Sequence, residues 1–396
     1  MRSSSKAIGE ASRPGRSRWR PELPSRRDPR LGGPEFADLS AAAAWYDGWL
    51  REAALPLWAE AGVDPEDGGF REALTWTGAP HDPRRRSRVQ ARQAFVYATA
   101  AAEGIPGPWL AAAQRGFDRF LDQMRREDGL FVAILGRDGA RDDRTAYLYE
   151  HAFILLAMAA LGRVDLAREV RGRLEAFRHD AGGFREAGEW PFQANASMHL
   201  FEAALAWEAV DDDAGWAAMA DELGRLALTR LIDPATGALS EFFDRDWRRL
   251  PGEQGLIEPG HQFEWAWLLD RWGAARGRAD ARAAAVRLFT VGRRGFDPRR
   301  NVVVDALTQD LAVRDGAARL WPQTEHLKAA LTLGDEAAAL QAANGLAAYL
   351  DTPARGVWRE RMRADGSFVE EPSPATSFYH LFLAIRELAR YAGEPC

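Results

Sequence analysis

The stretch DPATG at 233–237 is one of four related turns that decide the fold of this 396-residue chain. The other three are DPEDG (64–68), DPRRN (297–301) and TPARG (352–356). In such turns proline presets φ at an early position, and the closing glycine or asparagine tolerates a positive φ. Two shorter versions, EDG at 127–129 and DAGG at 180–183, raise the number of related turns to six.

The six turns divide the chain into units of similar length. The intervals between their closing residues are 61, 53, 55, 64 and 55 residues, for the markers Gly68, Gly129, Gly182, Gly237, Asn301 and Gly356. Most of the chain between them is rich in Ala, Leu and Trp, as in helices, and strand-like alternation is confined to short pieces. These pieces are GLFVAIL (129–135), ALSEFF (238–243) and NVVVDAL (301–307).

Repeats of this kind that lack polar capping units can close on themselves. We therefore predict an all-α fold, an (α/α)6 barrel of six helical hairpins with short β-hairpins at the loops. The first helices of the pairs are expected at 87–102, 148–161, 197–209, 262–272, 322–333 and 376–391. Their partners are expected near 108–125, 164–178, 214–231, 279–295 and 335–351, with 38–60 closing the ring.

Composition predicts one catalytic barrel domain at 37–396 and a flexible Arg/Pro/Ser-rich tail at 1–36. The tail has too few aliphatic residues to pack.

The totals also bear on partners and location. A net charge of −6 argues against a nucleic acid partner. No run approaches the ~20 apolar residues that span a bilayer. The single cysteine, Cys396, excludes an internal disulfide and suits the cytoplasm. A homodimer is compatible with this composition, although no residue pattern defines an interface.

Chemically reactive side chains recur early in the first helix of every unit. The distances from the turn markers are 24, 22, 17, 24, 24 and 24 residues, for Arg92, His151, His199, His261, Glu325 and His380. In a closed barrel the first helices would form the inner ring, and their equivalent ends would meet at one mouth. The spacing therefore predicts a single polar site built from six segments.

The segment EPGHQFEW at 258–265 places His261 in the first turn of the fourth of these helices. The partial positive charge of a helix N-terminus disfavours an imidazolium, so His261 is expected to be a neutral base near pH 7. Glu264, three residues on, is expected either to oppose this effect by favouring the charged ring or to orient the ring. The structural alternative is a histidine near a helix cap with a capping-box glutamate.

The other candidates also have structural alternatives. His380 and His199 lie among apolar residues, as buried core histidines do, and His326 is expected to be structural. Trp321 falls near the predicted mouth, and aromatic faces pack on the C–H groups of sugars.

Metal-binding spacings such as HExxH are absent, as are the nucleotide-binding motifs GxxxxGK[ST] and GxGxxG. No metal and no cofactor are therefore expected.

At these motifs the sequence resembles the N-acylglucosamine 2-epimerase family, which includes mannose isomerases and cellobiose 2-epimerases. The matching segments are RVQARQ, YEHAF, MHLFEA, EPGHQFEWAWLL, RLWPQTEHLKA and SFYHLF, from Arg88 to Phe382. The sequences of these segments are most similar to those of the D-mannose isomerase branch. The resemblance implies an (α/α)6 barrel and a metal-free proton transfer on an open-chain monosaccharide.

The resemblance also implies roles for individual residues. His261 and His380 match the family's two acid/base histidines. The residues that match its substrate-binding positions are Arg92, His199, Glu264, Trp321, Glu325 and, more loosely, His151. The implied reaction interconverts D-mannose and D-fructose through an enediolate. The alternative is a 2-epimerase acting on N-acylglucosamine, cellobiose or a free aldose.

Two other classes compete with this interpretation. Glycoside hydrolases and polysaccharide lyases also use helical barrels, and a hydrolase would need a carboxylate pair such as Glu264 and Glu325. A sugar-binding protein without activity would not need His261 and His380, and both are present. A phosphorylated or sulfonated sugar would require a basic pocket, for which Arg84–Arg88 is the only hint in the sequence.

Overall fold

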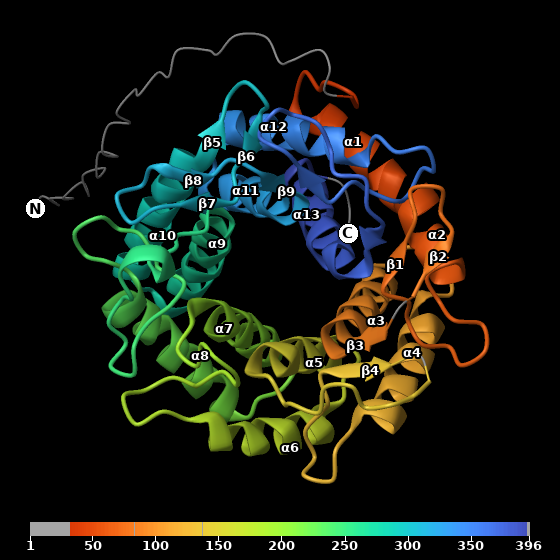
Figure 1. Ribbon diagram of the computed structural model, residues 1–396, viewed down its shortest axis with the longest axis horizontal. Helices are drawn as coiled ribbons and strands as arrows, with labels where there is room; N and C mark the ends of the chain where they lie inside the picture. The colour runs from red at the N-terminus through yellow and green to blue at the C-terminus, as the bar shows by residue number, and fades with distance from the viewer. Residues whose placement is uncertain (1–31, 83, 137, 394–396) are drawn as a thin grey trace, which may run out of the picture.

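The computed structural model describes residues 32–82, 84–136 and 138–393, which form two concentric rings of helices around a central axis (Figure 1). The inner ring consists of α3 (Ser87–Ala102), α5 (Leu148–Ala160), α7 (Ala194–Glu208), α9 (Pro259–Arg276), α11 (Leu320–Leu333) and α13 (Phe378–Tyr391). The outer ring consists of α1 (Leu39–Trp49), α2 (Leu55–Glu60), α4 (Trp109–Met124), α6 (Val164–Leu174), α8 (Ala214–Leu226), α10 (Ala279–Gly292) and α12 (Glu336–Ala347). The predicted (α/α)6 barrel is confirmed.

Burial separates the two kinds of helix. The outer helix α4 buries a single stripe that includes Trp109, Ala113, Phe117 and Phe120, at the three- and four-residue spacing of one helix face. The inner helix α9 is buried on nearly all sides, from Pro259 to Leu269 without interruption. The polar side chains of this buried stretch, such as His261, Gln262 and Glu264, therefore lie inside the barrel.

Short non-α segments extend the outer helices to the predicted ends. The segments are η1 (Leu50–Ala54), η2 (Glu175–Phe177), η3 (Ala227–Leu231), η5 (Arg293–Gly295) and η6 (Ala348–Leu350), of which η1 and η3 are π-helical and the others 3-10. Two further 3-10 turns, η4 (Gly252–Gln254) and η7 (Ala375–Ser377), precede α9 and α13. Each outer helix with its extension ends where the turn of the next unit begins.

All six turn markers have the backbone conformation that their residue types predict. Their φ values are +76°, +83°, +88°, +75°, +57° and +107°, in the order Gly68, Gly129, Gly182, Gly237, Asn301 and Gly356. Asn301 is the one non-glycine of the set, and its side-chain amide donates to the carbonyl of Gln341 on α12 at 2.8 Å. The repeated turn is therefore a real structural repeat.

The strands are shorter than the sequence suggests. They are β1 (Ala73–Leu74), β2 (Pro80–His81), β3 (Arg84–Arg86), β4 (Ile134–Gly136), β5 (Phe296–Asp297), β6 (Val302–Val303), β7 (Ala306–Leu307), β8 (Val313–Asp315), β9 (Ala318–Arg319), β10 (Arg361–Met362) and β11 (Ser373–Pro374). All pairs are antiparallel, and β1 pairs with both β2 and β11. The β1–β11 pair, with Ala73 opposite Pro374, joins the first and last units and helps to close the ring.

The start of the barrel differs from the prediction. Most of the predicted tail, residues 1–31, lies outside the described residues. Phe36, however, is buried against Trp45 and Tyr46, with ring centroids 5.7 and 5.5 Å apart. Its backbone N–H donates to the side chain of Asn344 at 2.6 Å. Phe36 therefore belongs to the barrel, because an aromatic ring gains more from packing than a polar segment does. No helix among the described residues is long and apolar enough to cross a membrane.

Gly345 on α12 provides a test of the repeat packing. A Cβ atom there would lie 1.9 Å from the carbonyl oxygen of Asn301, so backbone must move to accommodate it. Gly345→Ala should destabilise the protein by about 1–3 kcal/mol and lower the midpoint of thermal unfolding. The control is Gly172→Ala on α6, where a Cβ meets nothing within 4 Å and an alanine favours the helix. Equal midpoints for the two variants would contradict the packing described here.

Candidate active site

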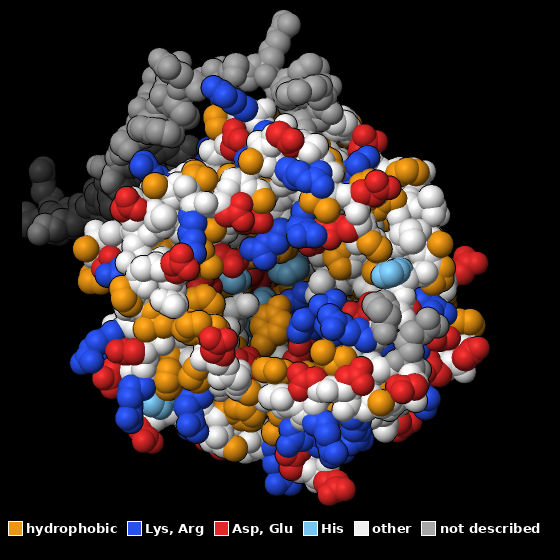
Figure 2. All heavy atoms as spheres, in the orientation of Figure 1, with side chains coloured by type: hydrophobic (Ala, Val, Ile, Leu, Met, Phe, Trp, Pro, Cys, Tyr) orange, Lys and Arg blue, Asp and Glu red, His pale blue; other side chains and the backbone are white. Residues whose placement is uncertain are grey.

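A cavity of about 730 Å³ opens at one mouth of the barrel, over the first turns of the inner helices. All six inner helices contribute lining residues: Arg92 from α3, Tyr149 from α5, His199 from α7, His261 and Glu264 from α9, Trp321 from α11 and His380 from α13. Figure 2 shows histidine side chains at the floor of this central hollow, with basic side chains beside it. Six of the eight predicted site residues therefore line one cavity.

His261 is held by a glutamate that the sequence analysis missed. Its Nδ1 donates to Glu241 Oε2 at 2.7 Å, and Glu258 Oε2 lies 3.7 Å from the same nitrogen. Burial by itself would lower the pKa of His261, but these carboxylates outweigh burial and raise the pKa to about 9. The expectation of a neutral ring is therefore wrong, since nearby carboxylates outweigh a helix dipole, and the residue that orients the ring is Glu241.

His380 has the same kind of partner but the opposite charge state. Its Nδ1 donates to Glu325 Oε1 at 2.9 Å, and Glu325 is fully buried. Burial, together with the positive charges of Arg92 and Lys328, holds the pKa of His380 well below its usual range. His380 is thus a neutral imidazole at pH 7, and Nε2 is the nitrogen left for a ligand.

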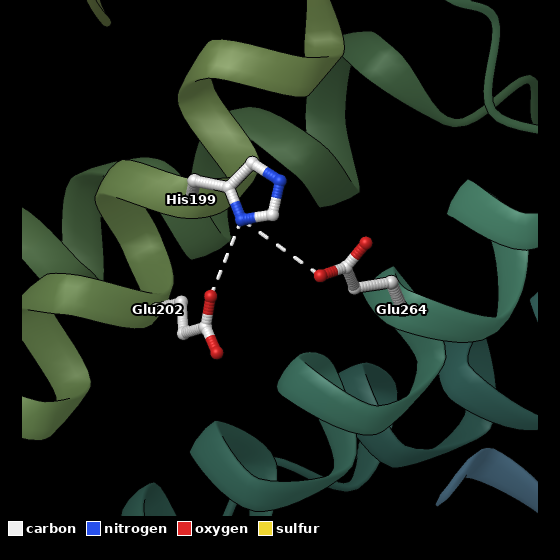
Figure 3. Close-up of side chains that lie close together, drawn as sticks. All are labelled: His199, Glu202 and Glu264. Atoms are coloured by element: carbon white, nitrogen blue, oxygen red, sulfur yellow. Dashed lines mark hydrogen bonds and ion pairs between the residues drawn. The ribbon is translucent and has the colours of Figure 1, made fainter. Parts of the chain in front are cut away.

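His199 completes the set of cavity histidines (Figure 3). Its Nδ1 donates to Glu202 Oε2 at 3.2 Å and lies 3.8 Å from Glu264 Oε1. Tyr379 donates its hydroxyl hydrogen to the other oxygen of Glu202. Burial lowers the pKa of His199 to about 4, so it is also neutral. Glu202 follows His199 by three residues on one helix face, a spacing from which it could have been found in the sequence.

Trp321 lies between the two predicted acid/base histidines. Its ring centroid is 4.9 Å from that of His261 and 5.8 Å from that of His380. A Cβ atom at position 260 would lie 2.5 Å from the Trp321 ring. Gly260 therefore lets this ring approach the first turn of α9, which explains the glycine directly before His261.

Arg92 is the cavity arginine without a carboxylate partner among the described residues. Its guanidinium donates to the carbonyl of Thr376 at 2.9 Å and to the hydroxyl of Tyr149 at 2.8 Å. Its Cζ lies 3.8 Å from the centre of the Phe153 ring. The other cavity arginines pair with acids, in the pairs Arg86–Glu72, Arg88–Glu150 and Arg319–Glu258. Arg92 thus retains positive charge that is available to an anionic oxygen.

Two predicted substrate-binding residues do not line the cavity. His151 is fully buried, its Nδ1 donates to the Tyr147 carbonyl at 2.6 Å, and its Nε2 accepts the Phe131 N–H at 3.1 Å. His151 lies two residues short of the 24-residue spacing, a rotation of about 200° around the helix, and α5 lines the cavity with Tyr149 and Glu150 instead. Glu325 lies behind His380 and contacts it instead of the cavity.

Two groups of described side chains bring nitrogen and oxygen atoms within 4.8 Å of one another: His199, Glu202 and Glu264, and also Glu264, Glu325 and His380. In each group the histidine Nδ1 already donates to a carboxylate. Lys328 supplies a cation beside the second group, with its Nζ 2.7 Å from Glu325 Oε2. Each histidine is thus paired with one acid, whereas neither carboxylate oxygen of Glu264 has a hydrogen-bond partner among the described residues.

Comparison with known proteins identifies the class to which this fold and site belong. Mannose-6-phosphate isomerase of Rhizobium meliloti (strain 1021) is 46% identical over 380 residues, covering 89% of this chain and 97% of the relative. D-mannose isomerase of Thermobifida fusca is 30% identical over 338 residues, covering 74% of this chain and 79% of the relative. A crystal structure of D-mannose isomerase superposes with a TM-score of 0.79 at 21% identity, over 88% of this chain and 97% of that chain.

The protein is therefore an enzyme of the carbohydrate isomerase and epimerase class. The family of N-acylglucosamine 2-epimerases (GlcNAc 2-epimerase) matches residues 68–384. The chain belongs to this family.

The Glu241–His261 pair generates a prediction about pH. Glu241→Gln should lower the pKa of His261 by about 1–3 pH units, because burial then acts without its nearest opposing charge. The pKa of His261 is higher in the folded protein than the unfolded value of 6.5. Protonation of His261 therefore stabilises the fold fully below pH 6.5, and this stabilisation is lost as the pH rises through about 9. The variant should therefore lose stability most at pH 6 and least at pH 9.5.

The measurement is an NMR titration of His261, combined with thermal unfolding at both pH values. Glu189→Gln, an exposed glutamate at the edge of the same cavity, is the matched control and should leave the pKa of His261 unchanged. An unaltered pKa in Glu241→Gln would contradict the pairing.

Proposed function

We propose that this enzyme interconverts D-mannose and D-fructose, with His380 as the base and His261 as the acid. The observation that carries the proposal is that two histidines face one cavity, each with its Nδ1 on a buried carboxylate, while their surroundings shift their pKa values in opposite directions. Titratable groups whose surroundings push their pKa values apart are suited to acid and base roles in one reaction. Positioned acid–base catalysis of this kind contributes roughly 10²–10⁴ in rate.

In the proposed reaction, Nε2 of His380 takes the proton from C2 of the open-chain aldose. The electrons of that C–H bond form the C1=C2 double bond, and the former carbonyl oxygen O1 takes up negative charge. The imidazolium of His261 gives its proton to O1, while Arg92 stabilises the developing charge. His380 then returns its proton to C1, His261 recovers a proton from O2, and C2 becomes the ketose carbonyl.

The epimerase alternative differs only in the last proton transfer. Return of a proton to C2 from the opposite face would give the 2-epimer instead of the ketose. Two relatives, one named mannose-6-phosphate isomerase and the other D-mannose isomerase, support the aldose–ketose outcome. Hydrolysis is less well supported, since Glu325 lies behind His380 and does not flank a bond in the cavity.

The charge of the cavity favours an unphosphorylated sugar. The described lining contains four arginines and seven acidic residues, and three of the arginines pair with carboxylates. A phosphate dianion prefers uncommitted arginine or lysine groups. We therefore propose free D-mannose as the substrate, although one relative is named for the 6-phosphate.

The first test is incubation of the enzyme with D-mannose and EDTA in heavy water, followed by NMR. We expect fructose, with deuterium at the proton-transfer carbons. His380→Asn and His261→Asn should each reduce turnover by about 10²-fold or more, because each removes one proton-transfer group. Glucose as the sole product would replace the isomerase proposal with the epimerase alternative.

A second assay compares D-mannose with mannose 6-phosphate. The kcat/KM for D-mannose should be the larger by about tenfold or more, because a phosphate would have to displace existing ion pairs. A preference for the phosphate ester would contradict the proposed substrate while leaving the histidine chemistry intact.

A further inference from the structure

Lys328 is a buried charged residue that the proposed reaction does not use. It lies on α11 one turn after Glu325, and the side chains of both residues are completely buried. Its Nζ is 2.7 Å from Glu325 Oε2, while Oε1 of the same carboxylate accepts the Nδ1 hydrogen of His380. Lys328, Glu325 and His380 therefore form a continuous chain of contacts that ends at the cavity.

The sequence makes this lysine conspicuous. The chain has 52 lysines and arginines together, and Lys6 and Lys328 are its only lysines. An arginine is planar and forked, whereas a lysine ammonium is a compact point charge. The single lysine in the barrel thus stands where a small cation fits between buried acids.

The surroundings of Lys328 favour its charged form. Burial by itself would lower the pKa of Lys328, but the carboxylates of Glu325, Glu264 and Glu202 raise it. The ammonium also lies 4.1 Å from the centre of the Trp267 ring, which attracts a cation. Within the described part of the chain, Glu325 has no other lysine or arginine partner.

A carboxylate buried as deeply as Glu325 would take up a proton if it had no cation beside it. A protonated Glu325 could donate a hydrogen bond to His380 Nδ1 instead of accepting one. The proton of His380 would then lie on Nε2, the nitrogen that faces the cavity, and that nitrogen could no longer act as a base.

We propose that Lys328 is a positioning residue for the reaction: its ammonium keeps Glu325 ionised, so that His380 carries its proton on Nδ1 and presents a basic Nε2. This inference rests on the proposed role of His380 as the base. The charged and titratable groups around the chain of contacts are Glu202 and His199 from α7, Glu264 from α9, Tyr379 from α13 and Arg92 from α3. None of these surrounding groups forms an ion pair with Glu325, as Lys328 does.

The kinetic test uses Lys328→Met, which keeps much of the side-chain volume and removes the charge, and Lys328→Arg, which keeps the charge. Lys328→Met should reduce kcat for D-mannose by about 10²-fold with KM changed less than about threefold, as for a group that acts in the chemical step. Lys328→Arg should recover part of kcat. In a Glu325→Gln background, Lys328→Met should have little additional effect. Additive losses, or equal losses in both lysine variants, would overturn the proposal.

The second readout does not depend on the substrate. In protein labelled with ¹⁵N histidine, the His380 signal, assigned with His380→Asn, should show protonated Nδ1 and unprotonated Nε2. Lys328→Met should shift that signal toward the other tautomer. An unchanged tautomer in a folded Lys328→Met variant would overturn the proposal, whether or not D-mannose is the substrate. A wild-type enzyme that does not convert D-mannose, but loses the tautomer in Lys328→Met, would contradict only the proposed substrate.

Discussion

The hydrogen bond from a histidine Nδ1 to a buried glutamate is the interaction on which the site depends. It occurs three times around the cavity, in the pairs His261–Glu241, His380–Glu325 and His199–Glu202. Each pair fixes the orientation of the ring and leaves Nε2 for a ligand. A carboxylate behind an imidazole controls both the tautomer and the basicity of the opposite nitrogen.

The same partner produces different charge states because the wider surroundings differ. Glu258 lies near His261 and adds a second negative charge, whereas Arg92 and Lys328 place positive charge near His380. Electrostatic interactions are stronger inside a protein than in water, so charges at this depth decide which ring holds a proton. One cavity can therefore contain both an acid and a base of the same residue type.

Closure of the barrel makes this burial feasible. The inner helices are covered on the outside by the outer ring, and β1 pairs with β11 where the first and last units meet. Their polar side chains consequently face the axis, where ion pairs and hydrogen bonds offset the loss of hydration. The first turns of six helices converge on one mouth, so residues hundreds of positions apart share a cavity.

Much of the fold could be predicted from local signals. The Asp/Thr-Pro turns marked the six units, since proline and a residue tolerant of positive φ act through their own backbone conformations. The 24-residue spacing also brought Arg92, His261 and His380 to the cavity, and it placed Glu325 behind His380. His151 failed this criterion because two residues correspond to more than half a helical turn, and a side chain there points into the outer packing.

The sequence by itself determined the number of units, the helical hairpins and the residue types at the mouth, because these follow from local conformation and periodicity. Only the tertiary structure decided which acid meets which histidine. Glu241 comes from a loop 20 residues before His261, and Glu325 meets His380 from another helix 55 residues away. Charge states depend on distances through space and on burial, and neither quantity is encoded in the spacing of residues along the chain.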